Sequence, residues 1–282
     1  MRFLVCGLVL LAGSASPVFA GDFGDLLLRG SAQPAADPPN YHRWGGMYFG
    51  GQASADFGGV DLSGPSPGMI NGIARLDANF TNIPLTSFIS LPRLNSTSAG
   101  FGGFFGYNYQ IDDVVAGFEF NLNSASLKAK ASDSHSQAYF VTANNALYDA
   151  TYNVTGSASA QLTDYATIRG RLAWAYQNFL PYAFFGASIA RVTWTSAVNV
   201  NYFGTPDASV PAPKPGNIGS NWTQADGGSN RFSFGYDVGI GLDYALTQNI
   251  FLRGEIEYID LGAPGGIKLN TSSVHGGVGV QF

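Results

Sequence analysis

The chain has 282 residues, of which only 12% are charged, against about 25% in a typical soluble domain. The formal net charge is −5 and the 14 Lys and Arg residues form no cluster, which excludes a surface for neutralising nucleic-acid phosphates. The length fits a single barrel domain, and the scarcity of charge indicates that much of the surface is not in contact with water.

Residues 1–20 have the layout of a secretory signal peptide. Arg2 precedes an apolar run over residues 3–11, and small residues lead to Ala20, where cleavage is expected. Cleavage also removes Cys6, the only cysteine, so no disulfide or thiol chemistry is expected in the mature chain. Residues 21–43 are rich in Pro and Ala and are predicted to form a flexible periplasmic segment. It leads into a predicted barrel over residues 44–282.

Alternating sequences after residue 43 predict eight β-strands. No segment has the ~18 consecutive apolar residues of a membrane helix, whereas ~9–11 tilted residues are enough for a strand. The connections alternate between short and long, as in a barrel with short periplasmic turns and long extracellular loops. The predicted fold is therefore an all-β, eight-stranded antiparallel up-and-down transmembrane β-barrel. Its strands are placed at residues 44–57, 98–109, 113–127, 162–176, 179–198, 231–246, 249–262 and 270–282.

Charged side chains in these strands share a parity opposite to that of the apolar residues. In residues 231–246, for example, every second residue is a large apolar one and the intervening residues are small or acidic. An eight-stranded barrel is barely wide enough for side chains, so the charges are predicted to pair and to plug the lumen. An ion path is the alternative. The predicted lumen network comprises Glu119, Arg169, Arg171, Arg191, Asp237, Asp243, Arg253, Glu255 and Glu257.

Aromatic residues near the strand ends predict the membrane interfaces. Tyr182 and Trp194 share one parity and lie twelve positions apart. At ~3.3 Å per residue and ~45° tilt this is roughly 28 Å, close to the ~25 Å apolar band between aromatic girdles. Phe185, Ile189 and Arg191 share the other, inward parity of this strand. Apolar and charged residues are therefore less clearly separated here than in the other strands. The predicted girdle comprises Tyr176, Tyr182, Trp194, Tyr236 and Tyr244.

Five segments together resemble the alphaproteobacterial outer-membrane porin-like family, small barrels also described as outer-membrane immunogenic or opacity-like proteins. The resemblance covers nearly every predicted strand and none of the long connections. It implies an OmpA-type small barrel in the outer membrane of a Gram-negative bacterium, with outer-membrane lipid and the barrel-assembly machinery as partners and Phe282 as the assembly signal. The segments are WGGMYFGG (44–51), GGFFGYNYQIDDVVAGFEF (102–120), TIRGRLAWAYQNFLPYAFFGASIA (167–190), FGYDVGIGLDYALTQNIFLRGEIEYIDLG (234–262) and VHGGVGVQF (274–282).

The long connections 58–97, 128–161 and 199–230 are predicted to be extracellular loops. They are rich in Asn, Ser, Thr and Gly and are longer than strand closure requires. The leading hypothesis is a structural or surface-interacting module that meets an extracellular ligand at these loops; simple shielding of the barrel mouth is the plainer interpretation. The alternative function is a small-solute porin. The candidate contact residues are Tyr139, Tyr148, Tyr152 and Trp222.

No catalytic, cofactor or metal site is predicted. The three histidines, at positions 42, 135 and 275, are scattered, whereas a metal site needs convergent ligands. Ser273 and His275 share one strand face and suggest a lipid-modifying enzyme, but their parity places them toward the lumen, away from lipid. The enzyme is the least favoured hypothesis, and no cofactor is expected.

Overall fold

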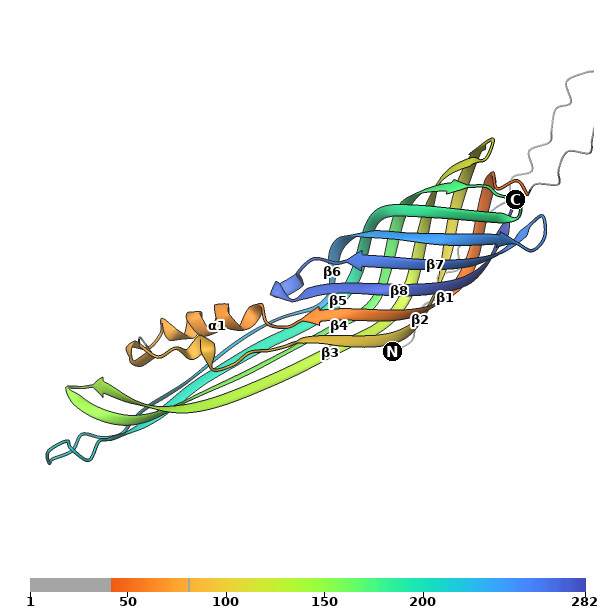
Figure 1. Ribbon diagram of the computed structural model, residues 1–282. Coiled ribbons are helices and arrows are strands. Elements are labelled where there is room, and N and C mark those ends of the chain that lie inside the picture. The colour runs from red at the N-terminus through yellow and green to blue at the C-terminus, as the bar shows by residue number, and fades with distance from the viewer. Residues whose placement is uncertain (1–41, 81) are drawn as a thin grey trace, which may run out of the picture. The chain divides into compact units, whose positions relative to one another are not determined.

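The structure is a computed structural model that describes residues 42–80 and 82–282. The predicted signal peptide with Ala20, and the predicted periplasmic segment apart from its last two residues, lie outside the described residues. The described residues form one compact unit, in which eight consecutive antiparallel strands close into a barrel (Figure 1). The predicted fold class is confirmed. The strands are β1 (Gly46–Asp61), β2 (Arg93–Ile111), β3 (Val114–Ala143), β4 (Ala146–Trp174), β5 (Phe179–Pro206), β6 (Ile218–Ala245), β7 (Ile250–Asp260) and β8 (Lys268–Gln281).

The connections differ between the two ends of the barrel. At one end, which we call the short-turn end, turns of two to four residues join β2 to β3, β4 to β5 and β6 to β7. At the other end, the β1–β2 connection contains α1 (Pro65–Ala74), η1 (Ala78–Phe80) and η2 (Leu85–Ser87), and η3 (Pro264–Gly266) precedes β8. None of the helices in the described part of the chain is long and apolar enough to cross a membrane.

Two of the predicted loops are mostly strand. β3 to β6 have 28 to 30 residues each, so residues 128–161 continue β3 and β4 to a hairpin turn at Asn144 and Asn145. Both Asn residues have positive φ, 48° and 59°, as a two-residue type I′ turn requires. Residues 199–230 likewise continue β5 and β6, and only residues 207–217 connect them. These segments were predicted to be loops because they are rich in polar residues. In the structure those residues, mainly Ser, Thr and Asn, cover a solvated face of the sheet.

Beyond the barrel, β3 to β6 form a separate four-stranded sheet (Figure 1). We call it the extended sheet (residues 127–162 and 192–231). It has two edges, because β2 pairs with β3 only as far as Ser124 and β7 pairs with β6 only from Tyr236 onward. Register shifts lie at the junction in all three strand pairs. Bulges bend and twist strands, so the sheet leaves the barrel wall at this level.

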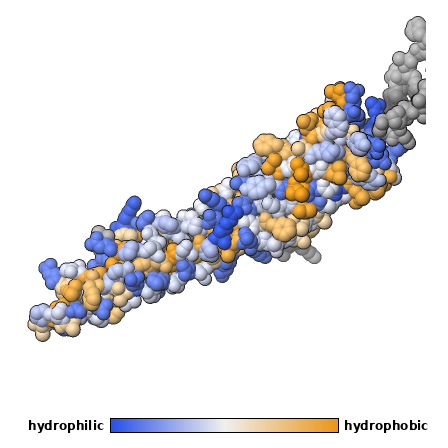
Figure 2. Space-filling view, in the orientation of Figure 1, coloured by the Kyte–Doolittle hydropathy of each residue, from blue (hydrophilic) through white to orange (hydrophobic). Residues whose placement is uncertain are grey.

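The outer face of the barrel carries a belt of large apolar side chains. Phe101 is 73% exposed, Phe234 72% and Ile168 65%. Hydrophobic residues are concentrated over the barrel, whereas much of the extended sheet is pale or hydrophilic (Figure 2). A soluble protein rarely exposes so large an apolar surface, whereas a transmembrane barrel turns such a belt toward lipid.

Barrel closure predicts a heat-dependent shift in gel mobility. A closed sheet has no edge strand at which unfolding begins, so the folded chain should resist detergent until it is boiled. Boiled and unboiled samples of the mature chain should therefore migrate differently in a detergent gel, and a sample unfolded in urea beforehand should match the boiled one. Solubility without detergent, combined with a single mobility, would contradict the transmembrane barrel.

Candidate functional site

The barrel interior is filled in layers, and the layer at the short-turn end is aromatic. Trp44 is 1% exposed, and its ring lies 6.0 Å from that of Phe251. Phe251 in turn contacts Phe104 and Tyr48 at 6.1 and 6.0 Å. These rings close the barrel at this end. We call the layer the aromatic floor; it consists of Trp44, Tyr48, Phe104, Val115, Ala173, Leu180, Tyr182, Phe184, Ala245 and Phe251.

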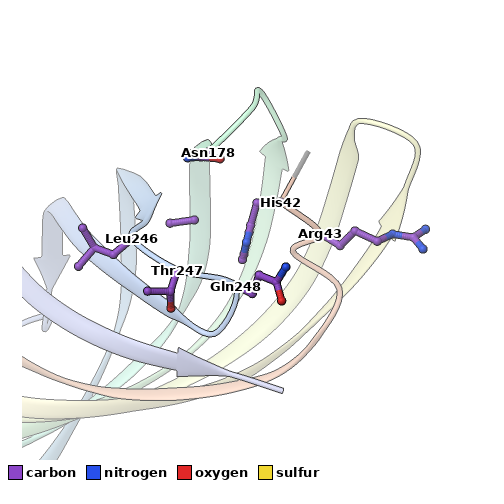
Figure 3. Close-up of a pocket in the computed structure, with 7 residues that line it drawn as sticks. His42, Arg43, Asn178, Leu246, Thr247 and Gln248 are labelled. Carbon is purple, nitrogen blue, oxygen red and sulfur yellow. The ribbon is translucent and has the colours of Figure 1, made fainter. Parts of the chain in front are cut away.

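The residues that lead into β1 are held across this end of the barrel. Nε2 of Gln281 donates to the carbonyl oxygens of Arg43 (2.8 Å) and Gly45 (3.1 Å). The ring of His42 lies 4.4 Å from Trp44, and burial lowers the pKa of His42. A pocket of about 400 Å³ lies here, and Arg43 points away from its other lining residues (Figure 3). Those residues are His42, Asn178, Ala245, Leu246, Thr247 and Gln248.

Inward aromatic rings lie over glycines of the neighbouring strand. A Cβ at Gly241 would collide with the ring of Tyr182, and a Cβ at Gly239 with Phe184. The same relation holds between Gly279 and Phe251 and between Gly50 and Phe104. The small residues that alternate along residues 231–246 therefore provide the space that inward rings from β5 occupy.

Above the floor, Glu119 is the centre of a buried charge network. Its Oε1 lies 2.6 Å from Nη2 of Arg169, and its Oε2 lies 2.7 Å from Nη1 of Arg253 and 3.2 Å from Nη1 of Arg171. Tyr48 donates its hydroxyl to the same Oε2 at 2.6 Å. All four charged side chains are at most 2% exposed. One carboxylate thus binds three guanidinium groups in a site without bulk water.

Two more carboxylates complete this layer. Asp243 accepts from Arg171 at 2.8 Å and from Arg253 at 2.9 Å. Glu255 accepts from Arg169 and from the Tyr182 hydroxyl, both at 2.6 Å. Each guanidinium also stacks on a floor ring at 3.9 Å: Arg169 on Phe184, Arg171 on Tyr182 and Arg253 on Phe104. The layer therefore combines three Arg with three carboxylates and rests on the aromatic floor.

Further acidic groups lie beyond this network, away from the floor. Glu257 lies 3.3 Å from Arg169 and 2.9 Å from Nε2 of His275. Asp237 is fully buried, and neither of its carboxylate oxygens has a side-chain hydrogen-bond partner. Ser273 and His275, the residues of the enzyme hypothesis, are both buried inside the barrel.

An apolar layer fills the interior at the extended-sheet end. It joins residues from β1, β3, β4, β5, β7 and β8, and Val192, Ile259, Leu261 and Ile267 are at most 2% exposed. Free space between β1, β3, β4 and β8 amounts to about 10 Å³, about the volume needed for one water. Aromatic, charged and apolar side chains thus form three successive layers across the described interior.

The structure places eight of the nine predicted lumen residues inside the barrel, and the exception is Arg191. Arg191 lies on the outer face, where it pairs with Asp164 at 3.2 Å with 45% of its side chain exposed. Two predicted girdle residues are also corrected, because Tyr182 and Trp194 are buried inside. The inward and outward faces of β5 are therefore the reverse of the predicted ones. Phe185, predicted to point inward, is 65% exposed on the outer face. Tyr176 and Tyr236 are exposed, and Tyr244 is half-buried.

The predicted loop at residues 58–97 is folded against the extended sheet. Ile70 and Ile73 of α1 and Phe80 of η1 are each 1% exposed and pack on β4 and β5. The hydroxyl of Tyr152 donates to the carbonyl oxygen of Asn79 at 2.8 Å, and burial beside Tyr202 and Asp77 raises the pKa of Tyr152 to about 12. Tyr148 and Tyr152, predicted as contact residues, are therefore buried. Trp222 is 37% exposed.

The same connection also covers part of the free β3 edge. The amide of Ser90 donates to Oδ2 of Asp133 at 2.9 Å, and Phe88 contacts the rings of His135 (5.4 Å) and Tyr139 (6.2 Å). Closer to the barrel, the amide of Lys128 donates to Oγ of Ser96. These contacts were not predicted, because they join segments that are distant in sequence.

The outer face of the extended sheet is a ladder of hydroxyl and amide groups. Ser159 and Thr195 share a hydrogen bond of 2.8 Å, and Ser134 and Thr155 share another of the same length. Nδ2 of Asn199 donates to Asn221 at 2.6 Å.

At the far end of the sheet, the polar ladder is replaced by exposed apolar side chains: Phe140 (68%), Phe203 (58%) and Leu147 (37%). Within residues 42–80 and 82–282, no group of three or more His, Cys, Asp and Glu side chains could hold a metal ion.

Comparisons with known proteins point to one family. A sequence profile of the outer membrane protein beta-barrel domain matches residues 23–282, and no curated protein matches the chain. Ail, the attachment invasion locus protein of Yersinia pestis, is 10% identical over 84% of this chain and 99% of its own, with a TM-score of 0.33. Neisserial surface protein A is 15% identical over 83% and 97%, with a TM-score of 0.30. An outer membrane channel from Pseudomonas putida F1 is 9% identical over 88% and 100%, with a TM-score of 0.26.

Energetic coupling between Arg169 and Glu255 is predicted from their buried contact. Arg169→Met or Glu255→Gln alone leaves a buried charge without its partner and should each lower the unfolding free energy by about 3–5 kcal/mol. The double variant should lose less than the sum of the two. Urea unfolding in detergent micelles gives the three values.

The exposed pair Arg191 and Asp164 is the matched control. Its N–O distance of 3.2 Å is comparable, but a partly solvated pair of this kind contributes only about 0.2–1 kcal/mol. Additive effects of the Arg169 and Glu255 substitutions would contradict a stabilising network and would indicate solvated charges.

Proposed function

Because the chain belongs to the outer membrane protein beta-barrel domain family and resides in the outer membrane of a Gram-negative bacterium, we propose that it is a non-conducting surface module. In this proposal the barrel anchors the extended sheet outside the cell, and the sheet meets an extracellular ligand. The short-turn end faces the periplasm. Outer-membrane lipid surrounds the apolar belt.

The observation that carries the proposal is the filled barrel interior. A solute would have to displace the aromatic floor, the network around Glu119 and the apolar layer in turn. Breaking buried charge pairs is costly, and eight strands leave no width to spare. This argues against the alternative function, a small-solute porin.

The extended sheet supports the surface role. Its inner face is covered by α1 and η1, so the four strands are braced by a core of their own. Its outer face is solvated and ends in Phe140, Leu147 and Phe203. Exposed aromatic side chains on a rigid support are suited to act as contact anchors. The contact residues of this proposal replace the tyrosines expected from the sequence.

The proposal assigns no catalytic role. Ser273 and His275 are at most 2% exposed on the lumen side, so a membrane lipid on the outer surface does not reach them. The proposal also keeps Phe282 as the assembly signal for the barrel-assembly machinery. Its side chain is 70% exposed on the lipid-facing surface and stacks on Phe49 at 5.7 Å.

Planar-bilayer recordings test the absence of conduction. The purified mature chain should give no large, stable current steps, because no layer of the interior opens without breaking buried contacts. A variant in which an Asn-Gly turn replaces residues 63–90 should be equally silent, since the floor and the charge network remain. Reproducible open-channel steps in both proteins would overturn the proposal and favour the porin.

The tip of the extended sheet should contribute to binding at the cell surface. Cells that display the protein should bind a subset of an array of glycans and matrix proteins, and Phe140→Ser with Phe203→Ser should weaken that binding at least about tenfold, because burial of each ring contributes about 1.5–3 kcal/mol. Ser136→Ala with Thr155→Ala, lower on the same face, is the control. Equal binding by the tip variant and the control would contradict a contact role for the tip.

A further inference from the structure

The charges buried inside the barrel do not balance. Three Arg side chains face six carboxylates there, so the formal charge is −3 with His275 neutral. Protonation of His275 still leaves −2. The buried carboxylates are Asp56, Glu119, Asp237, Asp243, Glu255 and Glu257, and the buried guanidinium groups are Arg169, Arg171 and Arg253.

The excess is confined to one part of the interior. Glu119, Asp243 and Glu255 each contact at least two of the three guanidinium groups. On the side of these carboxylates away from the floor, Glu257 contacts a single guanidinium group, that of Arg169, at 3.3 Å. Asp56 and Asp237 form no ion pair. A buried carboxylate without a counter-charge is strongly destabilising. The outer part of the interior is therefore stabilised by any process that neutralises these groups, either protonation of a carboxylate or binding of a cation.

A row of oxygen atoms without hydrogen-bond partners lies beside the unpaired Asp237. Asn121, Thr167 and Ser188 are direct cross-strand partners on β3, β4 and β5, so their Cβ atoms are about 4.5–5.5 Å apart. Asn121 Oδ1, Thr167 Oγ1 and Ser188 Oγ all lack a partner, and each residue is at most 2% exposed. Asn121 Nδ2 donates to Glu119 at 2.8 Å, which leaves Oδ1 as the free end of this side chain.

Asp237 adjoins this row on the next strand. It pairs with Gly186, two residues before Ser188 on β5, and a Cβ on Gly186 would meet Asp237 Oδ1. Asp237 is therefore the diagonal neighbour of Ser188 on the same face of the sheet. Together the four residues offer five unpartnered oxygens, two of them from a carboxylate. We call Asn121, Thr167, Ser188 and Asp237 the oxygen row.

We propose that the oxygen row binds a hard divalent cation of the calcium type. Carboxylate, amide and hydroxyl oxygens are the ligands such ions prefer, and Ca²⁺ accepts six to eight of them in flexible geometry, with waters completing the set. Water alone would satisfy the hydrogen-bonding groups, but it would not offset the charge. The row contains one carboxylate and three neutral side chains, Asn, Thr and Ser. It therefore differs from the metal sites considered above, which consist of three or more His, Cys, Asp or Glu side chains.

The position of the row determines how the ion would enter. The aromatic floor and the apolar layer close the interior on both sides, so the cation binds while the barrel closes. Calcium should consequently affect refolding and the stability of the product rather than exchange freely with the folded protein.

Refolding of the full mature chain into detergent with either calcium or EDTA tests the proposal. Protein refolded with calcium should keep about one equivalent of the metal after gel filtration, measured by elemental analysis. Its thermal midpoint should exceed that of the EDTA sample by roughly 5 °C at calcium about 100-fold above Kd. Magnesium and sodium are tested in parallel.

Two isosteric variants separate this site from the balanced network. Asp237→Asn should retain no calcium and should have a higher midpoint than the wild type in EDTA, because it removes an uncompensated charge. Asp243→Asn, at a carboxylate that contacts Arg171 and Arg253 and lies outside the oxygen row, should lower the midpoint in both conditions and still show the calcium increment. Equal midpoints of wild-type protein with calcium and EDTA, stabilisation by sodium alone, or stabilisation only by acidic pH would each overturn the proposal.

Discussion

Three arginine side chains converge on the carboxylate of Glu119, and the interior of the barrel is organised around this contact. Because each guanidinium also reaches Asp243 or Glu255 and stacks on an aromatic ring, strands on opposite sides of the barrel are linked through a few atoms. Such a network is favourable only when every member is paired. The side chains packed around it leave its charged groups at most 2% exposed.

Small residues make this packing possible. Glycines such as Gly239 and Gly241 lie under inward rings of the neighbouring strand, so the six aromatic side chains of the floor fit into an eight-stranded barrel. Farther from the membrane the geometry changes, because bulges at the junction let β3 to β6 leave the barrel as a sheet with two edges. That sheet needs cover on its inner face, and α1 with η1 provides it. The barrel and the extended sheet thus have separate cores.

The errors of sequence-based reasoning have identifiable causes. Tyr182 and Trp194 looked like interface residues because aromatic spacing matched a bilayer, yet the Tyr182 hydroxyl donates to buried Glu255 at 2.6 Å, which requires the inward face. Arg191 was assigned to the lumen because its parity is opposite to that of Tyr182 and Trp194, whereas Asp164 provides a partner for it on the outer surface. On a strand with large residues on both parities, periodicity does not identify the inner face.

Strand alternation, the rhythm of short and long connections and the absence of long apolar segments were enough to determine an eight-stranded transmembrane barrel and eight of its inward charges, since these properties depend on local periodicity and length. The tertiary structure decided which charges touch, that β3 to β6 extend beyond the membrane, and that the β1–β2 connection packs on them. Those outcomes depend on strand register and on contacts between residues far apart in sequence, such as Glu119 and Arg253, which are 134 positions apart. Local sequence carries no direct signal of such contacts, because the pairing energy arises only when the closed barrel brings the two groups together.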